Sequence, residues 1–129
     1  MDTRKPPPIL RGTTELAATL IEFGEPVLEI LPSRPEEGEV REAVELLVSV
    51  WNAHALAAPA WGTQEPLQQI EAIADSADSP HFLVRVLKVL SDRKKTRFGA
   101  DNRVAEQWEI AGDGRSYLLR CEERAPIRS

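Results

Sequence analysis

The densest run of basic side chains lies within residues 92–103, where Asp-Arg-Lys-Lys-Thr-Arg-Phe occupies positions 92–98. Arg93 and Arg97 are four residues apart, so they would share one face of a helix, with Lys94 beside them. Such a cluster could bind an anion or the phosphates of a nucleic acid. The simpler interpretation is favourable charge at a helix C-terminus, paired with acidic parts of the chain. The candidate patch comprises Arg93, Lys94, Lys95, Arg97 and Arg103.

Acidic side chains dominate residues 15–45, which contain nine glutamates and two arginines. Three of these glutamates are spaced by three and four residues and would form one stripe on a helix. The simpler interpretation is a solvated stripe that keeps the protein soluble. The alternative is an acidic docking face for a basic partner. This candidate face consists of Glu22, Glu25 and Glu29.

The chain has one cysteine and two histidines, which are the side chains most often used as nucleophiles or metal ligands. Cys121 is expected on the inward face of a strand, where a cysteine behaves as a small hydrophobe. His54 continues the apolar side of a helix and is expected to be partly buried near the helix end. His81 lies on a polar stripe in the first turn of another helix. We therefore predict no metal site and no catalytic thiolate.

The sequence contains none of the short motifs that bind nucleotides or carry out hydrolysis. Phosphate-binding glycine loops, a zinc-protease helix, a paired Cys-x-x-Cys and a serine nucleophile elbow are all missing from it. We expect no cofactor. A catalytic site would have to use carboxylates inside the helical body, such as Glu45 near His54, but nine residues along one helix separate these two too far to meet.

Length and composition predict one ordinary globular domain. The chain has 129 residues, 42% hydrophobic and 29% charged, and a net charge of −5. Residues 1–92 carry 7 basic and 15 acidic side chains, and residues 93–129 carry 9 and 6, so the balances are −8 and +3. The acidic body argues against nucleic-acid binding. No apolar run approaches the ~20 residues needed to span a bilayer, and a lone cysteine is typical of a reducing compartment. We expect a cytoplasmic protein.

Two helices are predicted in the first half. The first starts after Thr13 or Thr14 and should kink or break near Gly24-Pro26. The second should start at a capping box formed by Ser33 and Glu36 and end before Pro59. It is apolar around most of its circumference, so we expect burial on more than one side, with Trp51 in the core.

Two further helices and a hairpin are predicted in the second half. The helices span roughly 64–74 and 80–97, and the second keeps a polar stripe at helical spacing. The hairpin consists of residues 104–110 and 115–122, joined by a two-residue turn at Asp113-Gly114. This turn pairs Ile110 with Tyr117, Trp108 with Leu119, and Glu106 with Cys121.

The predicted fold is therefore α+β: a four-helix bundle-like body, with its first helix kinked or broken near Gly24-Pro26, followed by a C-terminal antiparallel β-hairpin. Residues 1–12 are assigned to a disordered proline-rich arm, 13–123 to a single globular domain and 124–129 to a loose tail. Two helices leave only a narrow polar stripe. A symmetric homodimer burying the fourth helix or the hairpin face is therefore expected.

For function, the sequence favours a non-catalytic protein-interaction domain, such as an adaptor, a chaperone-like protein or a regulatory subunit, that acts through its surfaces. Its partner would be another protein or a second copy, with no membrane contact. The alternative is a nucleic-acid or anion-binding module that uses Arg93 to Arg103, although glutamates crowd the hairpin that would read RNA. A small carboxylate-based enzyme is the third hypothesis.

Overall fold

Helices and strands are segregated along the chain, as the α+β prediction requires. The computed structural model describes residues 10–32, 34–112 and 116–126. The helices are α1 (Glu15–Phe23), α2 (Glu25–Leu28), α3 (Glu37–Ala57), α4 (Glu65–Asp75) and α5 (His81–Arg97), and the strands are β1 (Leu10–Gly12), β2 (Val104–Gly112) and β3 (Tyr117–Arg124). The predicted fold class, with its break at Gly24, is confirmed.

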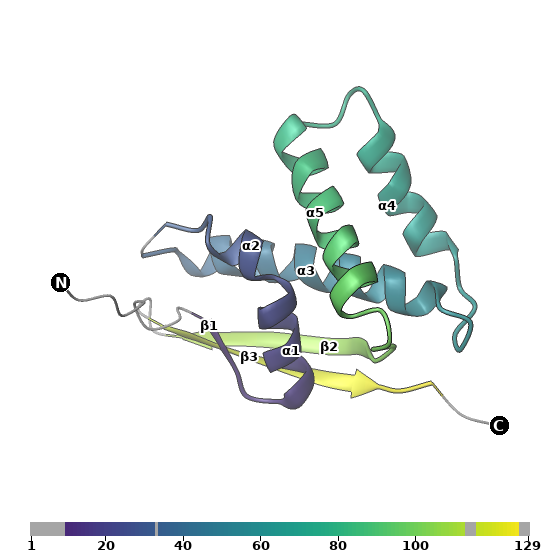
Figure 1. Cartoon of the computed structure of the whole chain (residues 1–129). Helices are drawn as coiled ribbons and strands as arrows, with labels where there is room; N and C mark the ends of the chain where they lie inside the picture. Colours follow the sequence, from purple (N-terminus) through teal and green to yellow (C-terminus); the bar gives the residue numbers. More distant parts are fainter. Residues whose placement is uncertain (1–9, 33, 113–115, 127–129) are drawn as a thin grey trace.

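The molecule has three layers (Figure 1). A three-stranded sheet, in the order β1-β3-β2, is covered on one face by α1 and α3. The helices α4 and α5 form an antiparallel pair that packs on α3 and extends away from the sheet. The core lies mainly between the sheet, α1, α3 and α5, and Trp51 is fully buried in it, as predicted. In contrast, no residue of α4 is buried.

Strand β1 was not predicted, because residues 1–12 were assigned to a disordered arm. That assignment is wrong for residues 10–12, which pair in parallel with β3, with Leu10 across from Tyr117. Leu10 is buried, and Gly12 packs so tightly on α1 that a side-chain Cβ there would collide with the backbone of Ala17 and Ala18. Thr14 then caps α1 by accepting a hydrogen bond from the Ala17 amide.

Helix α3 begins later than the predicted capping box placed it. Glu36 is its N-cap residue, and the Glu36 amide donates to the Glu39 carboxylate at 3.0 Å. The box is therefore formed by Glu36 and Glu39, and Ser33 lies outside the described residues. One physical reason is that the carbonyl of Pro35 accepts a hydrogen bond from the buried Tyr117 hydroxyl at 3.0 Å. This bond ties the segment before the helix to β3.

Two neighbouring side chains of α3 attach the helical layer to β2. The indole of Trp51 donates to the carbonyl of Arg103 at 2.7 Å. The amide of Asn52 bonds both backbone groups of Ala105, donating to its carbonyl at 2.9 Å and accepting from its N–H at 2.8 Å. The Asn52 side chain therefore takes the place of a neighbouring strand at the start of β2.

The hairpin is present, but its predicted register is wrong by two residues. Ile110 lies across from Leu119 instead of Tyr117, and Trp108 lies across from Cys121. Strand β3 also continues to Arg124, past the predicted end of the hairpin. A shift of two residues keeps Trp108, Ile110, Tyr117, Leu119 and Cys121 together on one face of the sheet, as predicted. The helix-facing side chains of the hairpin that are buried are Ala105, Ile110, Tyr117, Leu119 and Cys121, and Trp108 is half-buried.

In the observed register, Gly112 leaves the space that the Tyr117 ring occupies. Gly112 lies across from Tyr117, and a Cβ on Gly112 would collide with the tyrosine ring. A two-residue turn at Asp113-Gly114 would have required Gly112 to pair with residue 115 instead. The predicted turn itself lies outside the described residues.

Candidate functional site

The basic segment predicted as an anion patch is divided between buried and exposed positions, and Lys94 is its most buried member. Only 3% of Lys94 is exposed. Its ammonium group donates to the carbonyls of Phe98 and Asp101, both at 2.7 Å, and lies 4.4 Å from the centroid of the Trp51 ring. Burial lowers the pKa of Lys94, and the nearby Asp101 carboxylate opposes that shift. All its donor capacity is thus directed at groups of the same chain.

Arg93 and Arg103 are also used within the fold. The Arg93 guanidinium donates to the carbonyls of Phe23 and Glu22 at 2.9 and 2.8 Å, which satisfies the C-terminal end of α1. Arg103 forms an ion pair with Asp101 at 2.6 Å and a longer one with Glu15 at 3.2 Å.

The ion pair with Arg103 affects the pKa of the Asp101 carboxylate. Burial alone would raise the pKa of Asp101, but hydrogen bonds from Arg103 and the positive charges of Arg103 and Lys94 outweigh burial, so the pKa is lowered.

Two members of the predicted basic patch remain exposed, Lys95 and Arg97. The structure therefore does not bring the five side chains together on one surface. Arg93 connects α5 to α1, Lys94 bonds carbonyls of the loop after α5, and Arg103 pairs with Asp101. Arg93 and Lys94 bond backbone carbonyls, and of these three side chains only Arg103 pairs with acidic groups.

A cleft of about 160 Å³ lies between α3, α4 and α5, with His54 among its lining residues. Its walls combine apolar side chains, including Ile70 and Leu87, with opposite charges: Glu71 and Asp75 on α4, and Lys88 and Lys95 on α5. Within the part of the chain that the structure describes, His54 Nε2 is buried without a hydrogen-bond partner.

Burial, together with the positive charges of Lys95 and Lys94, lowers the pKa of His54 from 6.5 to about 4. His54 is therefore neutral at physiological pH. Its predicted position as a partly buried residue near the helix end is confirmed.

Cys121 is buried, and burial raises its pKa to about 11, so its thiol is protonated at neutral pH. This is the small-hydrophobe role that the sequence predicted. His81 is exposed at the start of α5. Among the described residues, no group of three or more histidine, cysteine, aspartate or glutamate side chains could hold a metal ion, and no helix is long and apolar enough to cross a membrane.

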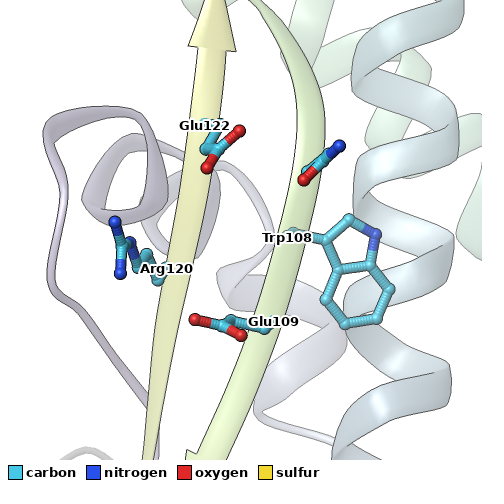
Figure 2. A pocket seen from close by; sticks show the side chains of 5 residues that line it. Trp108, Glu109, Arg120 and Glu122 are labelled. Atoms are coloured by element: carbon cyan, nitrogen blue, oxygen red, sulfur yellow. The ribbon is translucent and has the colours of Figure 1, made fainter.

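A second hollow, of about 140 Å³, lies on the hairpin (Figure 2). Glu109 and Arg120 are register partners on neighbouring strands, and Glu122 lies further along β3. Trp108 points away from these charged groups, toward the helical layer. The hollow is lined by Gln107, Trp108, Glu109, Arg120 and Glu122. Its charged groups are of mixed sign and exposed, so they do not form a pocket for one charge type.

Helix α5 carries exposed apolar side chains that packing within the fold does not account for. Phe82 and Val89 are 59% and 40% exposed, although both are large apolar side chains. They are seven residues apart and therefore share one side of the helix. Arg85 is exposed between them, three residues after Phe82 and four before Val89. We name these three residues the α5 flank.

The predicted acidic face is exposed at all three positions, Glu22, Glu25 and Glu29. The break at Gly24 divides it between the end of α1 and the short helix α2, so it is not a stripe on one continuous helix. Ile30 follows directly and is 56% exposed. We name these four residues the acidic surface.

Sequence reasoning did not identify the residues of the α5 flank, because it did not separate Phe82 and Val89 from the other apolar residues of this helix. The signal was present in the spacing: both residues lie within one turn of Arg85, which belongs to the polar stripe. Side chains next to a polar stripe lie at the edge of the buried face.

No protein-family model, no curated protein and no solved structure matches the chain.

Proposed function

We propose that the chain is a non-catalytic protein-interaction domain that binds its partner through the α5 flank. The observation that carries this proposal is the exposure of Phe82 and Val89 beside Arg85 on a helix that extends away from the sheet (Figure 1). Exposed apolar side chains bordered by charges are typical of binding surfaces. A cytoplasmic location, favoured by the single cysteine, belongs to the same proposal.

The chemistry of the partner follows from the charges around the flank. Arg85, Lys88 and Lys95 are exposed on α5, against one exposed carboxylate, Asp92. A complementary surface would offer apolar side chains for Phe82 and Val89 and carboxylates for the basic groups. We therefore expect the partner to be an acidic, amphipathic protein surface.

Nucleic-acid or anion binding by the basic segment has less support. Arg93, Lys94 and Arg103 already bond groups within the chain, so each would have to exchange those bonds for contacts with phosphate. Only Lys95 and Arg97 of the five are exposed, in a protein whose net charge is −5. We expect generic DNA or RNA to bind only weakly at physiological salt.

The test is site-specific photo-crosslinking in cells that express the chain. A photoreactive phenylalanine analogue is placed at Phe82, and in a control at Glu45, which is exposed on α3. We expect a discrete adduct from position 82 and none from position 45. The captured protein is then identified by mass spectrometry and purified.

Purified partner is finally titrated against the wild-type chain and the Phe82→Gln, Val89→Gln variant. We expect at least a tenfold loss of affinity, because hot-spot side chains typically contribute more than 1.4 kcal/mol. An adduct that forms equally at both positions, or an affinity that the variant leaves unchanged, would contradict the proposal.

A further inference from the structure

The α5 flank and the acidic surface lie at the same junction of the molecule. Arg93 is one helical turn beyond Val89 on α5, and its guanidinium donates to the carbonyls of Glu22 and Phe23. The short helix α2, which carries Glu25, begins two residues after Phe23 (Figure 1). The hydrogen bonds from Arg93 therefore hold the Val89 end of the flank close to Glu22 of the acidic surface, and Phe82 lies roughly 10 Å further along α5.

The two surfaces are opposite in charge, and each contains exposed apolar area. The α5 flank has Arg85 between Phe82 and Val89, and Lys88 is exposed one turn after Arg85. The acidic surface has three carboxylates and Ile30. In the part of the chain that the structure describes, none of these charged side chains forms an ion pair.

Like surfaces of two copies would not pair well. On α5 the exposed basic side chains Arg85, Lys88 and Lys95 outnumber the one exposed carboxylate, Asp92, so two α5 helices packed against each other would carry like net charge and repel. A contact between the α5 flank of one copy and the acidic surface of another pairs opposite charges instead. It also places Ile30 against Phe82 and Val89, which removes exposed apolar area from water.

Building on the proposed function, we infer that the partner is a second copy of this chain. The α5 flank of each copy contacts the acidic surface of the other, and both contacts form together around a two-fold axis. Because the two surfaces are neighbours on each copy, this symmetry closes the assembly at two copies. The contact is small and partly electrostatic, so the dimer is weak and loses affinity as salt is raised.

Charge exchange tests the inference by sedimentation velocity. Variant one carries Arg85→Glu with Lys88→Glu, and variant two carries Glu25→Lys with Glu29→Lys. We expect the wild-type mass to rise from 14.4 kDa toward twice that value as the concentration increases. Each variant alone remains at the monomer mass, because like charges then face each other.

An equimolar mixture of the two variants restores the dimer, since both contacts of the mixed pair again join opposite charges. A single chain with all four substitutions dimerises as well. Restoration also shows that both variants are folded. The control, Glu106→Lys with Glu109→Lys on β2, makes the same charge change as variant two at exposed positions and leaves the dimer intact.

A wild-type chain that stays at 14.4 kDa up to roughly millimolar concentration overturns the second-copy inference. So does a dimer that survives in both charge variants. If the chain is a monomer, the photoreactive group at Phe82 can still capture a different protein. The proposed function is then retained, provided that binding of this protein needs Phe82 and Val89. If the crosslink is also missing, both proposals fail.

Discussion

Lys94 is the residue at which burial and charge conflict most directly. It is enclosed beside Trp51, and its ammonium group is the donor for two backbone carbonyls at 2.7 Å. A methionine at this position would fill much of the same space but would leave both carbonyls without that donor. We expect Lys94→Met to lower the free energy of unfolding by about 1–3 kcal/mol.

The matched control is Lys95→Met, one residue further along the same helix. Lys95 is exposed, so this substitution should change stability by less than about 0.5 kcal/mol. Urea titrations of both variants give the comparison. Equal losses in the two variants would mean that the buried hydrogen bonds of Lys94 contribute nothing measurable.

His54 makes stability depend on pH. Its pKa in the fold is about 4, below the ordinary value of 6.5. Between these values the unfolded chain binds a proton that the folded chain excludes, so stability falls as pH drops from 6.5 to 4. The loss from this residue should reach about 2–3 kcal/mol near pH 4.

The measurement is the stability difference between wild type and His54→Gln at several pH values. Glutamine does not titrate, so the wild type should lose stability relative to the variant only below about pH 6.5. A difference that stays constant from pH 7 to 4 would show that His54 is protonated as easily in the fold as in the unfolded chain.

The basic segment shows which properties of individual residues could be predicted from the sequence. Its charges and their place at a helix end follow from sequence spacing. The identity of the buried member does not, because Arg93, Lys94 and Lys95 are consecutive and similar in chemistry. Which of them turns inward depends on the helix rotation set by Leu87 and Leu90 in the core, and on the loop carbonyls that happen to lie nearby.

At the scale of elements, the clearest prediction concerns strand β1. Its Gly12 lies against the α1 backbone, where a Cβ cannot fit. Gly12→Ala should therefore separate β1 from α1 and lower stability by more than about 2 kcal/mol. Gly38→Ala is the control, because nothing lies within 4 Å of a Cβ at this position.

Gly38 lies in the first turn of α3, where alanine is the better helix former. Gly38→Ala should therefore raise stability by up to about 1 kcal/mol. Thermal unfolding of the two alanine variants should show opposite shifts. A neutral Gly12→Ala would mean that β1 does not pack on α1 as described.

Periodicity predicted the helices well, because their apolar patterns are long. Strand β1 is only three residues long, too short for any periodic signal, and its partner lies more than 100 residues away. The hairpin register also depends on distant packing. The sheet contains an irregularity between Ala105 and Gln107, so Ala105 and Trp108 both face the helices although they are three residues apart.

At the scale of the whole molecule, the candidate surfaces follow from how the layers stack. Helices α1 and α3 cover one face of the sheet, and α4 and α5 cover α3, so the outer side of α5 has no further layer to cover it (Figure 1). The sequence predicted that a second copy would cover an apolar strip on either the fourth helix or the hairpin face. It could not indicate which residues form the strip, because that depends on the contact between α5 and α1 made by Arg93.

The central claim is that Phe82 and Val89 bind a partner and contribute little to the stability of the fold. Urea unfolding of the Phe82→Gln, Val89→Gln variant at low concentration tests it most directly, with Leu90→Ala as a buried comparison. We predict a loss below about 1 kcal/mol for the double variant, against about 2–5 kcal/mol for Leu90→Ala. A double variant as unstable as Leu90→Ala would place both side chains in the core and contradict the account.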